Sequence, residues 1–286
     1  MSKGFLIYAP NSKRKSTIDS AILTALSIKL SQNTYNNVAL LTDNKTKFTP
    51  FYYDENKKEK EYQVFDKIIE FPFSSKSVAE LQIGNIWQII HATPFEETIF
   101  CNNDILFFRD LYSEFEYMSY FNLLFPENTM SFNLEHNKHI AKHIEECKLP
   151  NILCDIFYFR KTGNDWEDVK EFFNMLEIIS KNWREVYYDI MKSYRPEKQD
   201  ICTNMSIAMR LSCYDLLNNV YTDKLNYTNS DQGWTEQYNY FLDDTCDLKI
   251  ENYTMQSPLK VNDKNFITDE VLNTYKTMYE IKNENN

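Results

Sequence analysis

Short apolar runs alternate along the chain with longer segments in which apolar residues recur at helical spacing. The short runs are typical of strands buried on both faces of a parallel sheet, and the longer segments are typical of amphipathic helices. The predicted strands are Gly4 to Ala9, Asn37 to Asp43, Phe65 to Phe73, Ile99 to Cys101, Ile105 to Phe108, Ser119 to Pro126 and Asn151 to Arg160. The predicted helices are Thr17 to Ser31, with Ser16 or Thr17 as its N-cap, Ser77 to Ala92, Trp166 to Tyr194 and Ile201 to Leu211. This order predicts an α/β fold that opens with a right-handed βαβ unit.

Polar residues follow three of these strands where the apolar run ends. Pro10 and Asn11 follow the first strand, Asp43 ends the second, and Asn102 to Asp104 separate Cys101 from the next apolar residues. The carboxyl ends of parallel strands form the edge of a sheet where ligands and their metal ions are held. Asn-Asn-Asp is equally compatible with a simple turn, because these residues bond their own backbone and tolerate the left-handed conformation.

Two aspartates later in the chain are candidates for chemistry. Asp155 interrupts an apolar strand, and an unpaired carboxylate is costly to bury, so it needs either a polar site or a cationic or hydrogen-bonding partner. Asp200 precedes the helix that begins at Ile201, where an N-cap is the alternative role to a catalytic one. Neither has a second carboxylate at a spacing that would assign an acid and a base.

Three histidines, His136, His139 and His143, lie in a polar segment. The last two would share one face of a helix, which a zinc site could use together with a third ligand. The chain has no His-Glu-x-x-His motif, so a solvated helix surface is the favoured interpretation.

Composition narrows the class of protein. The chain has 286 residues, 43% of them hydrophobic and 15% aromatic, which is enough for a packed core without metals or disulfides. The net charge of -11 argues against broad binding of a phosphate backbone. With 4 Gly there is no Gly-x-Gly-x-x-Gly or Walker loop. The 6 Cys form no Cys-x-x-Cys pair, and no signal sequence or membrane-spanning run is visible, so a reduced, cytoplasmic protein is expected.

The chain resembles nucleotide-sugar glycosyltransferases of the GT-A fold, particularly glycogenin-like enzymes and phage- or virus-borne retaining relatives. Thr93 to Leu111 is similar to the family's lead-in, apolar strand, Asp-x-Asp metal motif, apolar strand and Arg-Asp-Leu. Phe5 to Asn11 and Asp43 resemble the family's nucleotide-binding segments, and Leu259 to Lys264 resembles the loop that binds the diphosphate. Ile152 to Thr162 resembles the strand that carries donor- and acceptor-side polar residues. Lys198 to Ala208 resembles the start of the helix that faces the donor sugar. The similarity covers most of residues 3 to 265.

The resemblance implies a Rossmann-like mixed sheet flanked by helices, in a single domain over residues 1–286 with a helical C-terminal elaboration. Within it, residues 1–111 form the nucleotide-binding half, residues 112–265 the donor-sugar and acceptor half, and residues 266–286 a tail that is expected to fray from Glu280. The implied activity is transfer of a hexosyl or pentosyl group from a nucleotide-diphosphate sugar, such as a UDP-sugar, to a hydroxyl acceptor with retention.

The resemblance also implies roles for individual residues. Asp155 and Asp200 are the catalytic candidates, and Asn102 and Asp104 stand at the metal motif. The residues expected to bind the nucleotide sugar are Ala9, Pro10, Asn11, Asp43, Asn103, Lys260 and Lys264.

Two departures from the family pattern bear on the cofactor, which would be Mn²⁺ or Mg²⁺. Asn102 stands where the first Asp of the metal motif is expected, and Lys260 stands where relatives place a His ligand. An amide oxygen is neutral and an ammonium repels a metal ion, so the ligand set is depleted. Lys260 and Lys264, with basic residues at positions 13 to 15, are a substitute source of positive charge. A catalytically weak or inactive nucleotide-sugar-binding protein is the alternative function.

The acceptor is open. The abundance of Asn, Lys, Ile and Tyr is typical of an AT-rich genome, such as that of a phage, a virus or a low-GC bacterium. The candidate acceptors are a glycan, a cell-surface polymer or a hydroxymethylated DNA base, and the site of action would be the bacterial or host cytoplasm.

Overall fold

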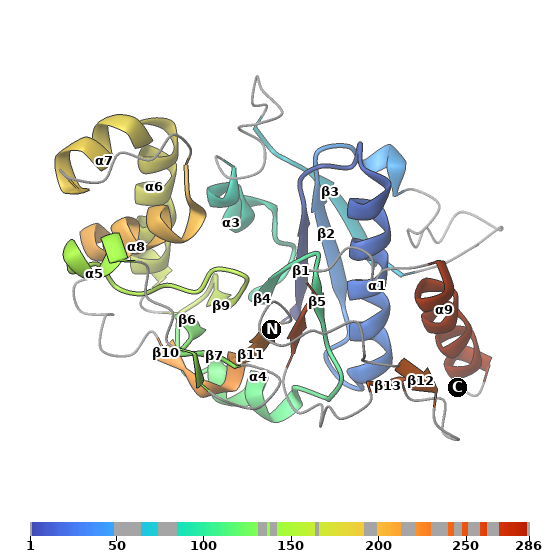
Figure 1. The fold of residues 1–286 in the computed structure, drawn as a ribbon. Coiled ribbons are helices and arrows are strands. Elements are labelled where there is room, and N and C mark those ends of the chain that lie inside the picture. Colours follow the sequence, from blue (N-terminus) through green and yellow to red (C-terminus); the bar gives the residue numbers. More distant parts are fainter. Residues whose placement is uncertain are drawn as a thin grey trace.

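The centre of the molecule is a mixed sheet, which has seven strands in the part of the chain that the structure describes (Figure 1). The structure is a computed structural model that describes residues 2–48, 64–73, 85–130, 136–137, 142–163, 166–191, 199–212, 221–229, 240–242, 248–250, 258–261 and 269–284. The strands of the main sheet, in spatial order, are β10 (Tyr221–Thr222), β6 (Leu123–Pro126), β9 (Ile156–Arg160), β4 (Glu97–Asn102), β1 (Lys3–Ala9), β2 (Val38–Thr42) and β3 (Lys67–Glu70). The predicted α/β class with a mixed sheet is confirmed.

The strand directions explain how distant segments meet. Strands β4, β1, β2 and β3 are parallel neighbours, so the segments that follow them lie along one edge of the sheet. Strand β9 runs antiparallel to both β4 and β6. The start of β9 therefore lies beside the end of β4, which brings the segment before Ile156 to the carboxyl edge of the parallel strands.

Two smaller sheets accompany the main one in the described residues. The five-stranded sheet has the order β5 (Ile105–Leu106), β14 (Leu259–Lys260), β11 (Tyr227–Asn229), β7 (Thr129–Met130) and β8 (His136–Asn137). Strands β12 (Tyr240–Leu242) and β13 (Leu248–Ile250) pair antiparallel. Because β5 follows β4 after a two-residue turn, the five-stranded sheet begins at the carboxyl edge of the main sheet.

Helices cover both faces of the main sheet, and alternate residues of the central strands separate two cores. Phe5 and Ile7 of β1 join the core under α1 (Lys15–Ser31) and α9 (Asp269–Glu284), whereas Leu6 and Tyr8 join the core on the opposite face. The helical elements associated with that second core are η3 (Ile86–Gln88), α3 (Ile89–Ala92), α5 (Lys142–Glu146), α6 (Trp166–Lys181), α7 (Trp183–Met191) and α8 (Ile201–Ser212). Figure 1 shows α1 and α9 on one side of the sheet and α6 to α8 on the other. Near-complete burial of the central strands explains their unbroken apolar sequence.

Several helix boundaries differ from the prediction. Helix α1 begins at Lys15, and its N-cap is Arg14 without a side-chain hydrogen bond, so neither Ser16 nor Thr17 caps it. The helix predicted from Trp166 to Tyr194 is two helices, α6 and α7. The short helix α4 (Tyr112–Met118), together with η1 (Lys45–Lys47) and η5 (Asp223–Leu225), was not predicted. Each missed element is too short to show a helical period clearly.

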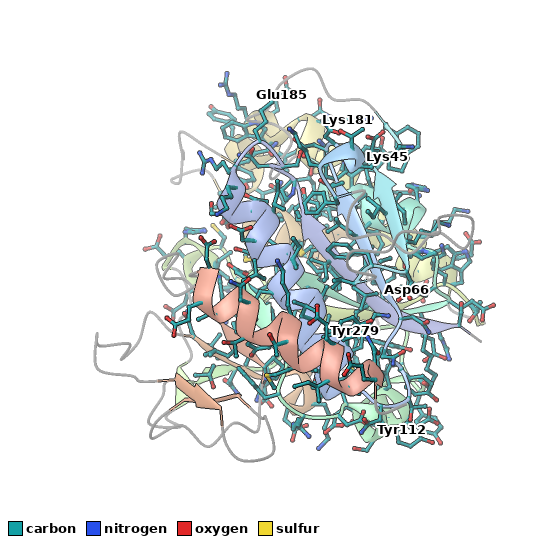
Figure 2. All side chains as sticks on the ribbon, turned by 90° about the vertical axis from the view of Figure 1, so that its right-hand side faces the viewer. Lys45, Asp66, Tyr112, Lys181, Glu185 and Tyr279 are labelled. Carbon is teal, nitrogen blue, oxygen red and sulfur yellow. A yellow bond between two sulfur atoms is a disulfide. The ribbon has the colours of Figure 1, made fainter. Side chains whose placement is uncertain are left out.

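The C-terminal helix α9 corrects the expectation of a frayed tail. Val271, Tyr275 and Met278 are buried in it, and Lys282 donates hydrogen bonds from Nζ to the carbonyl oxygens of Lys29 and Leu30 at the end of α1. Figure 2 looks onto this side of the molecule and shows α9 lying across α1. The acidic sequence after Glu280 is thus the exposed side of a docked helix as far as Glu284.

A disulfide corrects the expectation that the cysteines are reduced. Cys154 and Cys202 are bonded, with their Cα atoms 5.5 Å apart, and they join the segment before β9 to the first turn of α8. Sequence spacing did not reveal this pair because the two cysteines are at a sequence separation of 48. Cys101 and Cys147 are free thiols.

The amino ends of the central strands carry a buried polar network. Glu97, the first residue of β4, is 2% exposed, and its Oε2 accepts hydrogen bonds from the hydroxyls of Ser119 and Tyr158. The ammonium of Lys3 lies 3.5 Å from the same oxygen. Since these side chains satisfy one another, polar residues at this end of the sheet have a structural role.

Candidate active site

The loops after β1 and β2 lie side by side at the carboxyl edge, as the predicted βαβ unit requires. Ala9 pairs with Thr42 in the parallel ladder, and the backbone N–H of Ser12 donates to Oδ1 of Asp43 at 2.9 Å. Ala9 and Asn11 are buried, while Pro10 and Asp43 are half-buried. The structure therefore brings together the four nucleotide-binding candidates at positions 9, 10, 11 and 43.

The Asn102 to Asp104 segment connects β4 to β5, and its side chains have separate partners. Asn103 faces α1: its Nδ2 donates to the carbonyl of Thr17 at 3.2 Å, and its own carbonyl accepts from the Thr24 hydroxyl at 3.0 Å. Asn102 instead donates from Nδ2 to Oδ1 of Asp155 at 2.8 Å. The segment is a turn, as one of the two interpretations of its sequence predicts. Asn102 also contacts Asp155, and a turn alone does not need that contact.

That group, which we call the Asp155 cluster, consists of Asn102, Asp155, Tyr227 and Lys260. Tyr227 donates its hydroxyl to Oδ2 of Asp155 at 2.7 Å, and the Lys260 ammonium lies 2.9 Å from the same oxygen. The side chains of Lys260 and Asp155 are 19% and 15% exposed. Asp155 thus has both a cationic partner and hydrogen-bonding partners, as its apolar sequence neighbours predict, and water reaches its side chain only in part.

Backbone pairing fixes the members of the Asp155 cluster relative to one another. The N–H of Asn102 donates to the carbonyl of Asp155 at 2.8 Å, which extends the β4–β9 ladder by one bond. In the five-stranded sheet, Lys260 pairs with Ile105 on one side and Asn229 on the other. The N–H of Val261 donates to the carbonyl of Asp104 at 2.8 Å. Four segments that are distant in sequence are therefore held at one point by main-chain bonds.

Two pKa shifts describe the electrostatics beside Asp155. Burial raises the pKa of the Tyr227 hydroxyl far above its ordinary value, and the charges of Asp155 and Asp104 raise it further. Burial, followed by the charge of Asp104, likewise raises the pKa of the Cys101 thiol. Tyr227 consequently keeps its proton and acts as a donor to Asp155, and Cys101 stays neutral. The carboxylate of Asp104 is close enough to both to add to the negative charge of the site.

Asp200 is the N-cap of α8, as the structural alternative proposed. Its Oδ2 accepts from the backbone N–H of Thr203 at 2.7 Å and from the hydroxyl of the same residue at 2.5 Å. Tyr187 donates its hydroxyl to the carbonyl of Asp200 at 3.0 Å. The disulfide brings this cap toward the Asp155 cluster, because Cys154 precedes Asp155 and Cys202 lies two residues after Asp200.

His143 reaches the same cap from α5. Its Nε2 lies 3.0 Å from the Thr203 hydroxyl, and the ring is half-buried. Burial lowers the pKa of His143, while the charges of Asp200 and Glu146 oppose that shift. His143 is thus partly solvated and partly in contact with α8, where the sequence predicts a solvated helix surface. His139, its proposed partner for zinc, lies outside the residues that the structure describes.

The fit of a divalent cation to this site can be judged from the groups present. Asn102 has its amide nitrogen turned to Asp155, and both oxygens of Asp155 already accept hydrogen bonds or an ion pair. An ammonium lies within the group, at the position where a third ligand was expected. No set of three or more His, Cys, Asp or Glu side chains suited to a metal occurs among the described residues. Asp104 and Asp155 are the two carboxylates of this group, and Asp155 is already engaged by Asn102, Tyr227 and Lys260, so the residues do not fit Mn²⁺ or Mg²⁺.

The remaining basic candidates are partly placed. Lys15 lies 3.1 Å from Asp269 of α9 and 3.9 Å from Asp19, so its charge faces the C-terminal helix. Lys13 and Arg14 are exposed at the start of α1. Lys264 lies outside the described residues.

Comparison with known proteins identifies the fold. No protein-family model matches the sequence, and no curated protein matches it. The galactosyltransferase LgtC, solved with donor and acceptor sugar analogues, is similar over 97% of this chain and 95% of its own, with a TM-score of 0.51 and 9% identity. An active-site mutant of LgtC gives a TM-score of 0.54 over 96% of this chain and 94% of that one. The chain has the GT-A fold.

A second glycosyltransferase, GlyE from Streptococcus pneumoniae TIGR4, is less similar. It matches 78% of this chain at 9% identity with a TM-score of 0.43, and the chain spans only 45% of the length of GlyE. Among the described residues, no helix is both long and apolar enough to cross a membrane.

Sequence reasoning missed two features of the candidate site. Tyr227 was not singled out, because an isolated Tyr beside Asn226 and Thr228 carries no motif and its contact with Asp155 spans 72 residues. The Cys154–Cys202 bond was missed for the same reason. The sequence does indicate that Asp155 needs a partner, because its sequence neighbours are apolar, but it does not indicate which residues are the partners.

Proposed function

We propose that the protein is a glycosyltransferase that moves a hexosyl or pentosyl group from a nucleotide-diphosphate sugar to a hydroxyl acceptor. The observation that carries this proposal is the convergence of Ala9 to Asn11, Asp43 and the Asp155 cluster at the carboxyl edge of a GT-A sheet. This edge is where open α/β sheets bind their ligands. Function on a shared fold is argued from such a site, and the amino edge of the same sheet is closed by its own polar network.

The site divides into a nucleoside end and a sugar end. The buried residues Ala9 and Asn11 and the half-buried carboxylate of Asp43 suit the base and ribose of a UDP-sugar, because a carboxylate accepts hydrogen bonds from ribose hydroxyls. Lys260 and the turn at Asn102 to Asp104 face the diphosphate. Asn103 supports that turn by its bonds to α1 and has no need to touch the ligand.

In the proposed reaction the bond between the anomeric carbon and the diphosphate oxygen breaks, and the acceptor hydroxyl bonds to that carbon with retention. Negative charge develops on the departing diphosphate and positive charge on the sugar ring. Preorganised charges at these two places lower the barrier. We assign the first to Lys260 and the second to the carboxylates of Asp155 and Asp200, which orient sugar or acceptor hydroxyls.

A direct test is to incubate the protein with a panel of UDP-, GDP-, ADP- and dTDP-sugars without an acceptor and to measure release of free sugar and nucleoside diphosphate. Slow hydrolysis of one donor is expected, since water can replace the acceptor. Asp155→Asn should lower this rate at least ~10-fold, because it removes a charge from a hydrogen-bonded group. Absence of release and of transfer for every donor, with the protein folded, would contradict the proposal.

A second candidate is a nucleotide-sugar-binding protein without turnover. The depleted metal motif, with Asn102 and Lys260 in place of ligands, favours it. This alternative requires that calorimetry detect binding of a nucleotide sugar while product release stays at the level of the Asp155→Asn variant.

A further inference from the structure

The Asp155 cluster contains the positive charge of Lys260, and this charge bears on whether the reaction needs a metal ion. We propose that the ammonium of Lys260 occupies the place of a divalent cation and stabilises the departing diphosphate, so that the transfer requires no metal ion. This inference rests on the proposed function. Its evidence is the set of contacts around Asp155 and the way the sheet holds Lys260.

Asn102 is the first part of that evidence. Its Nδ2 lies 2.8 Å from Oδ1 of Asp155 and donates a hydrogen bond to it. A carboxylate at position 102 would face the carboxylate of Asp155 at this distance, and two acceptor-only groups repel unless a cation or proton lies between them. The amide removes that requirement, since it supplies a donor where a carboxylate would need a metal.

The balance of charge is the second part. The carboxylates of Asp104 and Asp155 with the ammonium of Lys260 leave one net negative charge. An Asp at position 102 and a neutral His at position 260, together with a divalent cation, would leave the same net charge. The two departures therefore compensate each other: one removes a negative charge, and the other supplies a positive charge without a metal.

The placement of Lys260 is the third part. It lies on β14, which pairs with β5 directly after the turn that contains Asp104, and Val261 is bonded to the Asp104 carbonyl. The Lys260 side chain is 19% exposed, so its charge is only partly screened by water. A divalent ion added at this point would lie next to a fixed ammonium and be repelled by it. A cation held in advance by a sheet stabilises a transition state without reorganisation.

The chemical step balances without a metal. The bonding electron pair between the anomeric carbon and the diphosphate oxygen passes to that oxygen, which gains a negative charge. The acceptor oxygen bonds to the anomeric carbon, and its proton passes to the departing diphosphate. Lys260 keeps all its protons and donates a hydrogen bond from its ammonium to the leaving group.

The first experiment uses the unaltered protein. Calorimetry with UDP, GDP, ADP and dTDP is run in EDTA and in MnCl₂, and sugar release from the matching donor is measured in both. We expect affinity and rate to agree within ~2-fold, because the cation of the site is part of the chain.

Variants of Lys260 locate the charge. Lys260→Met should weaken binding of the nucleoside diphosphate ~10- to 100-fold, as loss of a charged hydrogen bond does, whereas Lys260→Arg should keep most of the affinity. Lys170→Met, which removes an exposed lysine of α6, is the matched control and should bind as the unaltered protein does.

The double variant Asn102→Asp with Lys260→His, which we call the exchange variant, tests whether the two expected ligands make the site bind a metal ion. It should bind Mn²⁺, detected by electron paramagnetic resonance, and its affinity for the nucleoside diphosphate should depend on that metal. The unaltered protein should bind no Mn²⁺ in the same assay. If the exchange variant does not fold, the EDTA comparison and Lys260→Arg still decide the question.

The outcomes separate this inference from the proposed function. Turnover that EDTA abolishes and only Mn²⁺ restores would overturn the inference and leave a glycosyltransferase. Binding of a nucleoside diphosphate that is equal in EDTA and Mn²⁺ but without turnover of any donor would overturn the enzyme and support metal-free binding by Lys260. No binding of any nucleoside diphosphate under either condition would overturn both.

Discussion

In the Asp155 cluster, Tyr227 is the residue whose role is best defined by its contacts. Its hydroxyl is buried, keeps its proton and donates to Oδ2 of Asp155 at 2.7 Å. Tyr227→Phe removes this donor and leaves a partly buried carboxylate with less support. We expect the free energy of unfolding to fall by ~1.5–3 kcal/mol and sugar release to slow. Urea denaturation of the two proteins checks the first expectation.

Tyr275→Phe is the matched control for Tyr227→Phe. Tyr275 of α9 is 2% exposed, and its hydroxyl has no hydrogen-bond partner among the described residues. Removing a buried hydroxyl without a partner costs no hydrogen bond, so this change should be neutral or stabilising. Equal losses of stability in both variants would mean that the bond to Asp155 is not what Tyr227 contributes.

Asp200 has a structural role that can be separated from a catalytic one. Asn and Asp are equally good N-caps, whereas Ala costs ~1 kcal/mol. We therefore expect Asp200→Asn to unfold at the same urea concentration as the unaltered protein and Asp200→Ala at a lower one. If the carboxylate also orients the donor sugar, both variants lose turnover. Full turnover in Asp200→Asn would show that Asp200 only caps α8.

The sequence predicts residues of this site unevenly. The demand of Asp155 for a partner follows from its apolar neighbours, and the cap at Asp200 follows from its position before a helix. The identity of the partners does not follow, because Tyr227 and Lys260 both lie more than 70 positions from Asp155 in sequence and contact it only in the folded chain. Position 103 was predicted to bind ligand, but nothing in Asn-Asn-Asp tells which side chain turns to α1.

At the scale of elements, α9 depends on the end of α1. Lys282 donates to the carbonyls of Lys29 and Leu30, which have no partner within their own helix, and its charge complements the negative end of the helix dipole. Lys282→Ala should lower the free energy of unfolding by ~1–2 kcal/mol. Lys170→Ala, at an exposed i,i+3 pair with Glu167, should change it by less than ~0.5 kcal/mol. Similar effects of the two changes in urea denaturation would show that α9 is not anchored by Lys282.

The Cys154–Cys202 disulfide joins two elements that carry the catalytic candidates. It closes a loop across a sequence separation of 48 residues, so its removal by reduction or by Cys154→Ser with Cys202→Ser should cost up to ~4 kcal/mol through the entropy of the unfolded chain. Alkylation of the denatured, unreduced protein followed by mass spectrometry should label Cys101 and Cys147 but not this pair. Labelling of all four, or an unchanged melting temperature in reductant, would contradict the bond.

The elements differ in how well the sequence predicts them, and the reason is physical. The core strands β1 and β2 are predicted to within one residue at each end, and the predicted Ile99 to Cys101 lies inside the longer β4, because burial on both faces leaves an unbroken apolar run. Helix α4 was missed because Tyr112 to Met118 spans only two turns and exposes two aromatics, Tyr112 and Tyr117. The antiparallel direction of β9 leaves no local mark, since a buried strand has the same composition in either direction.

At the scale of the whole molecule, net charge discriminates among the acceptors. Binding to a DNA backbone needs a face of Lys and Arg that displaces counterions, and the protein carries a net charge of -11. The basic residues Lys13 and Arg14 are exposed at the start of α1, whereas Lys15 is paired with Asp269. A long-range field of this sign repels a polyanion and leaves a neutral glycan unaffected.

This charge argues for a glycan or another uncharged hydroxyl acceptor over a hydroxymethylated DNA base. We expect no binding of a hydroxymethylated DNA duplex up to ~100 µM at physiological salt, measured by fluorescence anisotropy, because non-specific complexes of basic proteins lie at or below that dissociation constant. Lowering the salt concentration should not reveal binding either, since repulsion between like charges grows as screening weakens. Micromolar binding that strengthens steeply as salt is lowered would contradict this and would place a basic groove on the molecule. Replacing Lys13 and Arg14 with Ala would then show whether the start of α1 forms it.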